Sequence, residues 1–148
     1  MNLSVAAEDD PDGATRRALD EGLDAFNDQR AGPDDAQDLW VIARDEDCAA
    51  VAGLKARTAY SWMFIDWLWV SSEQRGNGLG KQRLDIAEDA ARTRGCIGAY
   101  VDTYSFQAPD FYLKSGYEEF GRIDDMPPGH SCIWLRKRWE LIAGPGDE

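Results

Sequence analysis

The most specific chemistry in this 148-residue chain belongs to a run of glycines with a basic residue at each end. The run is Arg75-Gly76-Asn77-Gly78-Leu79-Gly80-Lys81, and it joins an apolar, strand-like segment to a segment with helical periodicity. Glycine lets the backbone bend until several N–H groups point into one concavity, and the N-terminus of the following helix adds its free N–H groups and its dipole. The run therefore suits a phosphate or pyrophosphate, although a tight strand-to-helix turn alone would use the same glycines.

Hydrophobic periodicity and turn residues predict the elements that position this run. The apolar segment 62–70 lacks polar alternation, which is typical of a central strand. The helix after the glycines begins at Leu79 and is capped near Gly95. The other expected elements are a strand 3–7, a helix 11–29, strands 39–44, 49–60 and 97–104, a short helix 108–115, and a final strand pair 117–122 and 132–139.

This order, β-α-β-β-β-α-β-α-β-β, is that of an α/β (α+β) sandwich with a mixed, mainly antiparallel sheet of about six to seven strands flanked by helices. The length suits one sizeable core, so we expect a single domain over residues 1–148 with a frayed tail at 144–148.

The charge of the chain limits its partners. Asp and Glu number 28 against 16 Lys and Arg, a formal net charge of −12, so a nucleic-acid backbone would be repelled and we expect no nucleic-acid partner. Aspartate dominates the acidic residues and arginine the basic ones. That bias fits a halophile, in which salt screens the self-repulsion, and it fits an ordinary acidic protein of a GC-rich genome equally well.

The cysteines and the N-terminus indicate the compartment. Cys48, Cys96 and Cys132 are odd in number and lack CxxC spacing, so we interpret them as small buried residues in a reducing compartment and expect no metal site. No apolar run approaches the roughly 20 residues that cross a bilayer, and no signal-peptide pattern opens the chain. We therefore expect a cytoplasmic protein without membrane contact.

Two stretches, in this order of elements, resemble the GNAT superfamily of N-acetyltransferases. The first, Leu68-Trp69-Val70-Ser71-Ser72-Glu73-Gln74-Arg75-Gly76-Asn77-Gly78-Leu79-Gly80, is similar to the family's strand followed by R-x-x-G-x-G/A. The second, Ala108-Pro109-Asp110-Phe111-Tyr112-Leu113-Lys114-Ser115-Gly116-Tyr117, is similar to A-x-x-F-Y-x-K-x-G-F with tyrosine in the last place. The resemblance extends over nearly the whole chain. It implies a GNAT-like fold that transfers the acetyl group of acetyl-CoA to a primary amine by direct attack in a ternary complex.

The resemblance also implies where acetyl-CoA lies. Relatives leave a splay beside the strand that ends here at Val70, and the pantetheine arm would pair with the main chain of Leu68, Trp69 and Val70 like an added strand. The pyrophosphate would be held by the amides of the glycine run, namely Arg75, Gly76, Asn77, Gly78, Leu79, Gly80 and Lys81. Ser105 stands where the family often has an asparagine that contacts the cofactor, and its hydroxyl replaces only part of that amide's hydrogen bonding.

Tyr112 occupies the family's general-acid position. A phenol is almost fully protonated at neutral pH, so it can protonate the departing CoA thiolate. Without the motif, Phe111 and Tyr112 would be interpreted as aromatic core residues of a short helix.

The general base has three candidates. Asp66 lies two residues beyond the place where many relatives have a glutamate. Burial among aromatic neighbours would make it a better base, but it could equally be a structural acceptor for a tryptophan N–H or an arginine. His130, the only histidine, lies in the loop that relatives place beside the acceptor. Asp102 on the next strand is the third candidate, and some relatives pass the proton through ordered water.

Acidic residues near the expected cleft favour a cationic acceptor, either a small-molecule amine or a protein or peptide amine. The apolar residues of the last strand would suit a homodimer face or the core of a monomer. An acyl-CoA-binding sensor or interaction domain without turnover is the alternative function. A nucleotide-binding α/β domain is disfavoured because no GK[ST] follows the glycines.

Overall fold

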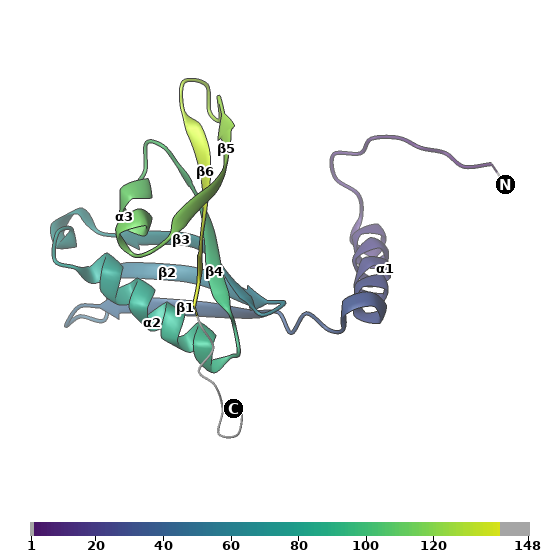
Figure 1. Cartoon of the computed structure of the whole chain (residues 1–148). Coiled ribbons are helices and arrows are strands. Elements are labelled where there is room, and N and C mark those ends of the chain that lie inside the picture. Colours follow the sequence, from purple (N-terminus) through teal and green to yellow (C-terminus); the bar gives the residue numbers. More distant parts are fainter. Residues whose placement is uncertain (1, 140–148) are drawn as a thin grey trace. The chain divides into compact units, whose positions relative to one another are not determined.

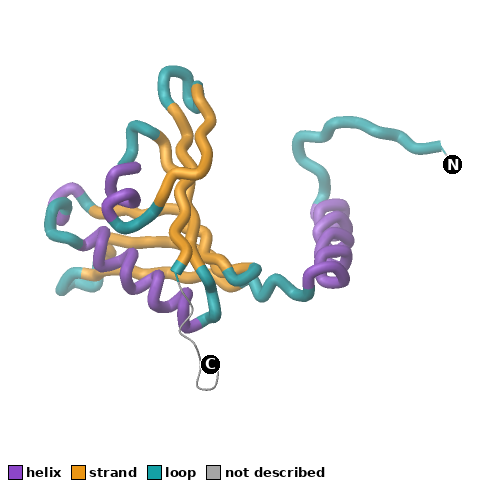
Figure 2. The backbone as a smooth tube through the Cα atoms, in the orientation of Figure 1, coloured by secondary structure: helices purple, strands orange, loops and turns teal. Residues whose placement is uncertain are grey.

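The computed structural model describes residues 2–139 (Figures 1 and 2). The tail expected at 144–148 lies outside the described residues. The chain divides into two compact units, one up to Asp34 and one from Asp35 onward. The single domain expected over residues 1–148 stays a prediction.

The first unit contains the helix α1, Gly13–Ala31. Asp12 caps its N-terminus, since the Asp12 carboxylate accepts a 2.7 Å hydrogen bond from the Thr15 N–H. The helix predicted at 11–29 is confirmed, but the strand predicted at 3–7 is wrong, because these residues have no regular secondary structure. Leu3 and Val5 are 80% and 92% exposed. A strand is stable only when a neighbouring strand pairs with its backbone, and a local apolar alternation does not supply that neighbour.

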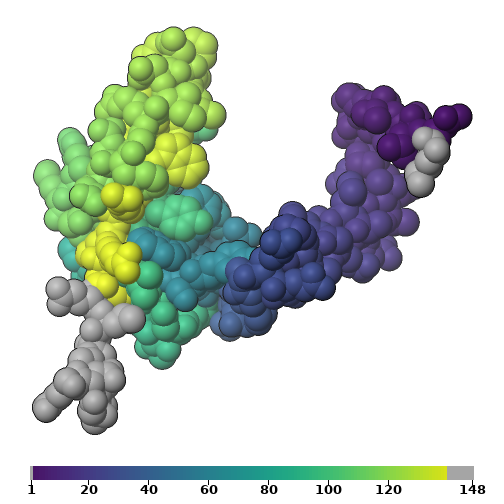
Figure 3. Space-filling model, turned by 45° about the vertical axis from the view of Figure 1, so that its right-hand side comes forward, coloured from purple at the N-terminus to yellow at the C-terminus, as the bar shows by residue number. Residues whose placement is uncertain are grey.

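Within residues 35–139, the second unit contains a sheet of six strands in the order β1-β2-β3-β4-β6-β5. Its elements are β1 Gln37–Arg44, β2 Ala50–Ala59, β3 Trp62–Val70, the 3-10 turn η1 Ser72–Gln74, α2 Leu79–Thr93, β4 Gly98–Tyr104, α3 Pro109–Lys114, β5 Glu118–Asp124 and β6 Ser131–Arg138. Only β3 and β4 are parallel, and every other neighbouring pair is antiparallel. The predicted mixed, mainly antiparallel sheet with a central β3 is therefore confirmed. In the space-filling view, β6 (yellow) lies against green and teal residues of the other strands (Figure 3).

The core lies between this sheet and α2, which crosses the face of β1, β2 and β3 (Figure 1). Leu84, Ala87 and Ala91 from α2 are completely buried in it. The parallel pair begins at Gly98, where an added Cβ would lie 2.5 Å from the Trp62 ring and 2.6 Å from the Lys137 carbonyl oxygen. Only glycine allows the three chain segments to approach so closely there.

The parallel strands β3 and β4 pair along only part of their length. Residues 62–65 of β3 pair with residues 98–101 of β4, and no pairing follows among the described residues. On the other side of β3, the register with β2 shifts between Lys55 and Ala56. Such a bulge bends and twists a strand. The C-terminal half of β3 therefore leaves β4, and the edge between them opens.

No helix of the described residues is long and apolar enough to cross a membrane.

Candidate active site

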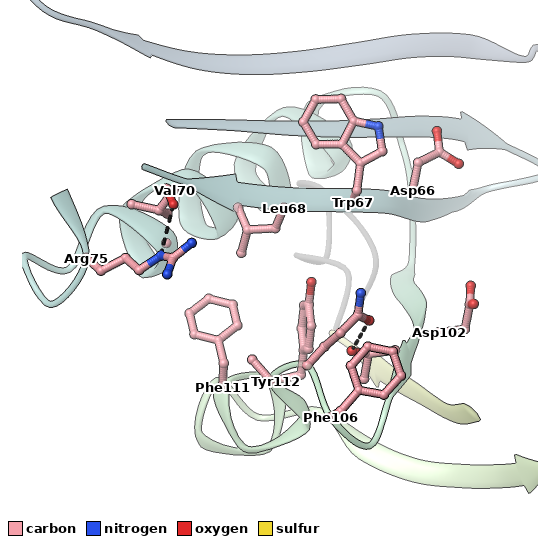
Figure 4. Close-up of a pocket in the computed structure, with 13 residues that line it drawn as sticks. Asp66, Trp67, Leu68, Val70, Arg75, Asp102, Phe106, Phe111 and Tyr112 are labelled. Atoms are coloured by element: carbon pink, nitrogen blue, oxygen red, sulfur yellow. Dashed lines mark hydrogen bonds between the residues drawn. The ribbon is translucent and has the colours of Figure 1, made fainter. Parts of the chain in front are cut away.

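A cavity of about 650 Å³ lies where β3 and β4 separate (Figure 4). Residues of β3, the connection after β3, the start of α2, β4, the loop after β4 and α3 line it: Asp66, Trp67, Leu68, Val70, Arg75, Gly80, Asp102, Thr103, Phe106, Gln107, Ala108, Phe111 and Tyr112. Figure 4 shows Leu68 from β3 and Phe111 and Tyr112 from α3 pointing toward one another across it.

A second hollow, of about 310 Å³, lies at the glycine run and is called the glycine hollow here. It is lined by Val70, Gln74, Arg75, Gly76, Gly78, Leu79, Gly80, Lys81 and Phe111. Four of these residues, Val70, Arg75, Gly80 and Phe111, also line the larger cavity. The two spaces therefore adjoin, and together they lead from the N-terminus of α2 to α3.

The backbone of the glycine run needs its glycines. Gly76 and Gly78 have φ angles of 86° and 73°, in the left-handed region that strains other residues. Gly80 allows a close approach instead, since an added Cβ would lie 3.3 Å from the Phe111 ring and the ring would have to shift by a few tenths of an ångström. No side chain of the described residues caps α2, so the first N–H groups of the helix are open to an anion.

The two basic residues of the run lie in different surroundings. The Arg75 Nε donates a 3.2 Å hydrogen bond to the Val70 carbonyl oxygen, which holds the guanidinium at both spaces. Lys81 pairs with Asp85 one helical turn later, so part of its charge is already compensated. Asn77 and Trp69 line neither space, although a main-chain contact through Trp69 does not depend on its half-exposed side chain.

Tyr112 lies on α3 with its side chain buried and its hydroxyl directed into the cavity (Figure 4). Burial, and then the nearby Asp102 carboxylate, raise the pKa of Tyr112 to about 12. Among the described residues its hydroxyl has no hydrogen-bond partner. The phenol is therefore protonated at neutral pH and free to donate to a group in the cavity.

The two carboxylates of the cavity differ in their partners. The Lys55 ammonium donates a 2.6 Å hydrogen bond to Asp66 and a 3.3 Å one to Asp38, and the Asp66 contact raises the pKa of Lys55. Asp102 has no cationic partner among the described residues. Within this part of the chain its carboxylate accepts a hydrogen bond from the Cys132 thiol, whose Sγ lies 3.8 Å away and whose pKa is raised by burial and by Asp102. Of the two carboxylates that line the cavity, Asp102 is therefore the one without a lysine partner among the described residues.

The structure places His130 and Ser105 outside the lining of the cavity. The His130 ring packs edge to face against the Phe106 ring, with ring centroids 4.9 Å apart, and it is Phe106 that lines the cavity. The Ser105 hydroxyl accepts a 2.9 Å hydrogen bond from the Ser131 N–H, which joins the end of β4 to β6.

Sequence reasoning missed Gln107, which lies in the loop between β4 and α3. Its Oε1 accepts 3.0 Å hydrogen bonds from the Thr103 hydroxyl and the Tyr104 N–H, so the orientation of its amide is fixed. Gln107 lines the cavity, and its NH₂ group remains available there. The sequence signal that could have identified Gln107 is its side-chain amide, which comes two residues after Ser105 in the loop that follows a predicted strand.

The chain matches the acetyltransferase (GNAT) family over residues 5–117. It is 34% identical to an acetyltransferase of Agrobacterium fabrum over 137 residues, which are 93% of this chain and 100% of the relative. It is 45% identical over 86 residues to the blasticidin-S acetyltransferase of Streptomyces morookaense, covering 57% of this chain and 63% of that enzyme. A crystal structure of a protein from Agrobacterium tumefaciens superposes with a TM-score of 0.84 at 34% identity, over 93% of this chain and 100% of that one. The chain is therefore an acyltransferase that belongs to the GNAT acetyltransferase family.

Proposed function

We propose that this protein transfers the acetyl group of acetyl-CoA to a primary amine within a ternary complex. The observation that carries the proposal is the Tyr112 hydroxyl, which belongs to a buried side chain, has no hydrogen-bond partner among the described residues and lies at a cavity that adjoins the glycine hollow. Family membership supports the acyl transfer itself.

The two adjoining spaces fit the two ends of acetyl-CoA. The pyrophosphate would lie at the N-terminus of α2, where free amides and the Arg75 guanidinium supply donors. The pantetheine arm would run along the unpaired edge of β3, with its amides paired to the main chain of residues 68–70. The Gln107 NH₂ group offers a further donor near the thioester end.

Two side chains of the cavity carry out the two proton transfers of the reaction, one from the amine and one to the thiolate. Asp102, directly or through a water molecule, takes the proton that the amine must lose before it attacks. Tyr112 gives its proton to the departing thiolate when the tetrahedral intermediate collapses. Asp66, neutralised by Lys55, flanks the acceptor and does not act as the base.

Two observations support a small cationic amine as the acetyl acceptor: the negative charge at the cavity and the activity named for one relative. Asp102 offers a carboxylate to an ammonium group, and Phe106 offers an aromatic wall beside it. The blasticidin-S acetyltransferase of Streptomyces morookaense supports an amine of an antibiotic-like small molecule as the first acceptor to test.

The test measures the release of free CoA thiol from acetyl-CoA with a panel of amines: blasticidin S, an aminoglycoside, a polyamine and a lysine peptide. We expect release that depends on at least one of the small-molecule amines. Tight CoA binding by calorimetry, with no release for any amine, would instead favour the acyl-CoA sensor. Absence of CoA binding would contradict both functions.

A further inference from the structure

A buried polar cluster packs against Tyr112, and its residues do not line the cavity. Its carboxylate is Glu88 of α2, which is 3% exposed. The Tyr117 hydroxyl donates a 2.9 Å hydrogen bond to one Glu88 oxygen, and the Lys137 ammonium of β6 donates one of 2.9 Å to the other. Arg92, whose Nη2 lies 3.9 Å from Glu88, closes the cluster toward the surface.

The cluster is joined to the helix that carries Tyr112. The Lys137 ammonium donates a second hydrogen bond, of 3.0 Å, to the carbonyl oxygen of Ser115, the residue that ends α3. The Tyr117 N–H donates to the Tyr112 carbonyl oxygen at 3.0 Å. The rings of Tyr112 and Tyr117 pack edge to face with centroids 5.6 Å apart. Both the backbone and the ring of Tyr112 therefore contact Tyr117, and Tyr117 is itself hydrogen-bonded to Glu88.

The helix α3 needs such support, because it has only six residues. An isolated helix of that length is unstable in water, so its position is set by its tertiary contacts. Apolar residues of similar volume would stabilise the site at least as well as a buried ion pair. The ion pair adds a defined geometry, because hydrogen bonds are directional. One Glu88 oxygen fixes the position of the Lys137 ammonium of β6, and the other fixes the position of the Tyr117 hydroxyl.

We propose that Glu88, Lys137 and Tyr117 are positioning residues for the acetyl transfer, and that they fix the Tyr112 hydroxyl at the site of the leaving thiolate. This inference rests on the proposed function, in which Tyr112 is the general acid. The three residues contact neither substrate. They act through Tyr112, and a small displacement of a proton donor reduces the rate of proton transfer strongly.

The test is a double-mutant cycle that combines Lys137→Met with Tyr112→Phe. Lys137→Met removes both hydrogen bonds of the ammonium but keeps an unbranched side chain. In the otherwise unchanged enzyme we expect kcat to fall about tenfold or more, with the KM for acetyl-CoA unchanged within about twofold. In the Tyr112→Phe enzyme, Lys137→Met should cause little further loss, because the hydroxyl that it positions is already absent.

Arg136→Met is the matched control, since Arg136 is the preceding residue of β6 and pairs with the exposed Glu118. It should leave kcat unchanged. Circular dichroism and the Kd for CoA check folding in every variant. Should Lys137→Met fail to fold, Tyr117→Phe deletes a single hydroxyl and serves in the same cycle.

A loss of kcat that is equal in both backgrounds would show a general structural role and overturn the inference. An unchanged kcat in Lys137→Met or in Tyr117→Phe would overturn it as well. If Tyr112→Phe itself leaves kcat unchanged, both the general-acid assignment and the positioning role are wrong. If Tyr112→Phe has a large effect and the Lys137→Met effect is additive to it, only the positioning role is wrong.

Discussion

The Lys55 ammonium lies 2.6 Å from the Asp66 carboxylate, and this contact distinguishes the surroundings of the two carboxylates at the cavity. The Asp66 carboxylate therefore already has a cationic partner. Asp102 has no cationic partner in residues 2–139, where it accepts a hydrogen bond from the Cys132 thiol.

Replacing each carboxylate by its amide tests this difference. We expect Asp102→Asn to lower kcat/KM for the amine by about a hundredfold, because a general base and an acceptor charge are lost together. Asp66→Asn should cost less, about tenfold or below. Steady-state kinetics at neutral pH measure both, with Asp124→Asn as the control, since Asp124 is exposed and bound to Ser131. A larger loss in Asp66→Asn would restore Asp66 as the base.

Adding a single methyl group to the glycine run should weaken the binding of CoA. Gly78→Ala places a side chain at φ 73°, which costs about 1–2 kcal/mol and displaces the amides at the start of α2. We therefore expect the Kd for CoA, measured by calorimetry, to rise about tenfold or more. Gly22→Ala is the control, because an added Cβ there meets nothing within 4 Å and the residue lies inside α1. Equal CoA affinity in Gly78→Ala and the unchanged protein would contradict a pyrophosphate site at this run.

The raised pKa values of the buried Tyr112 and Tyr117 predict that the free energy of unfolding falls at alkaline pH. Burial raises the pKa of Tyr112 from 10.0 to about 12, and burial together with the Glu88 charge raises the pKa of Tyr117 further. Above pH 10 the unfolded chain loses these phenolic protons while the folded protein retains them, so the free energy of unfolding falls as the pH rises from about 10 toward 12.

Urea unfolding at successive pH values measures this effect. Tyr117→Phe should show a shallower fall over the same pH range, because one of the two groups is gone. An equal fall in Tyr117→Phe and the unchanged protein would assign the alkaline instability to other groups.

The sequence predicts most elements of the second unit because their signals are local. β3 lies at 62–70 as predicted, and α2 begins at Leu79 after the glycines. The strand predicted at 3–7 fails because pairing requires a second strand. The predicted cytoplasmic location, adaptation to high salt and homodimer stay predictions.

The contacts that decide the chemistry are not local. Lys55 meets Asp66 through the register between β2 and β3, including its bulge, and no periodicity indicates that bulge. Glu88 and Lys137 are 49 residues apart and meet because β6 lies beside β4. Ser105 faces Ser131 for the same reason, which removes it from the cavity lining.

The most direct test of the central claim compares Tyr112→Phe with the unchanged protein at saturating acetyl-CoA and amine. The substitution removes one hydroxyl that lies at the cavity and has no hydrogen-bond partner among the described residues, so the fold and the Kd for CoA should be preserved. We predict that kcat falls about a hundredfold or more, as for the loss of a general acid. An unchanged kcat, or a loss that only mirrors weaker CoA binding, would contradict the account.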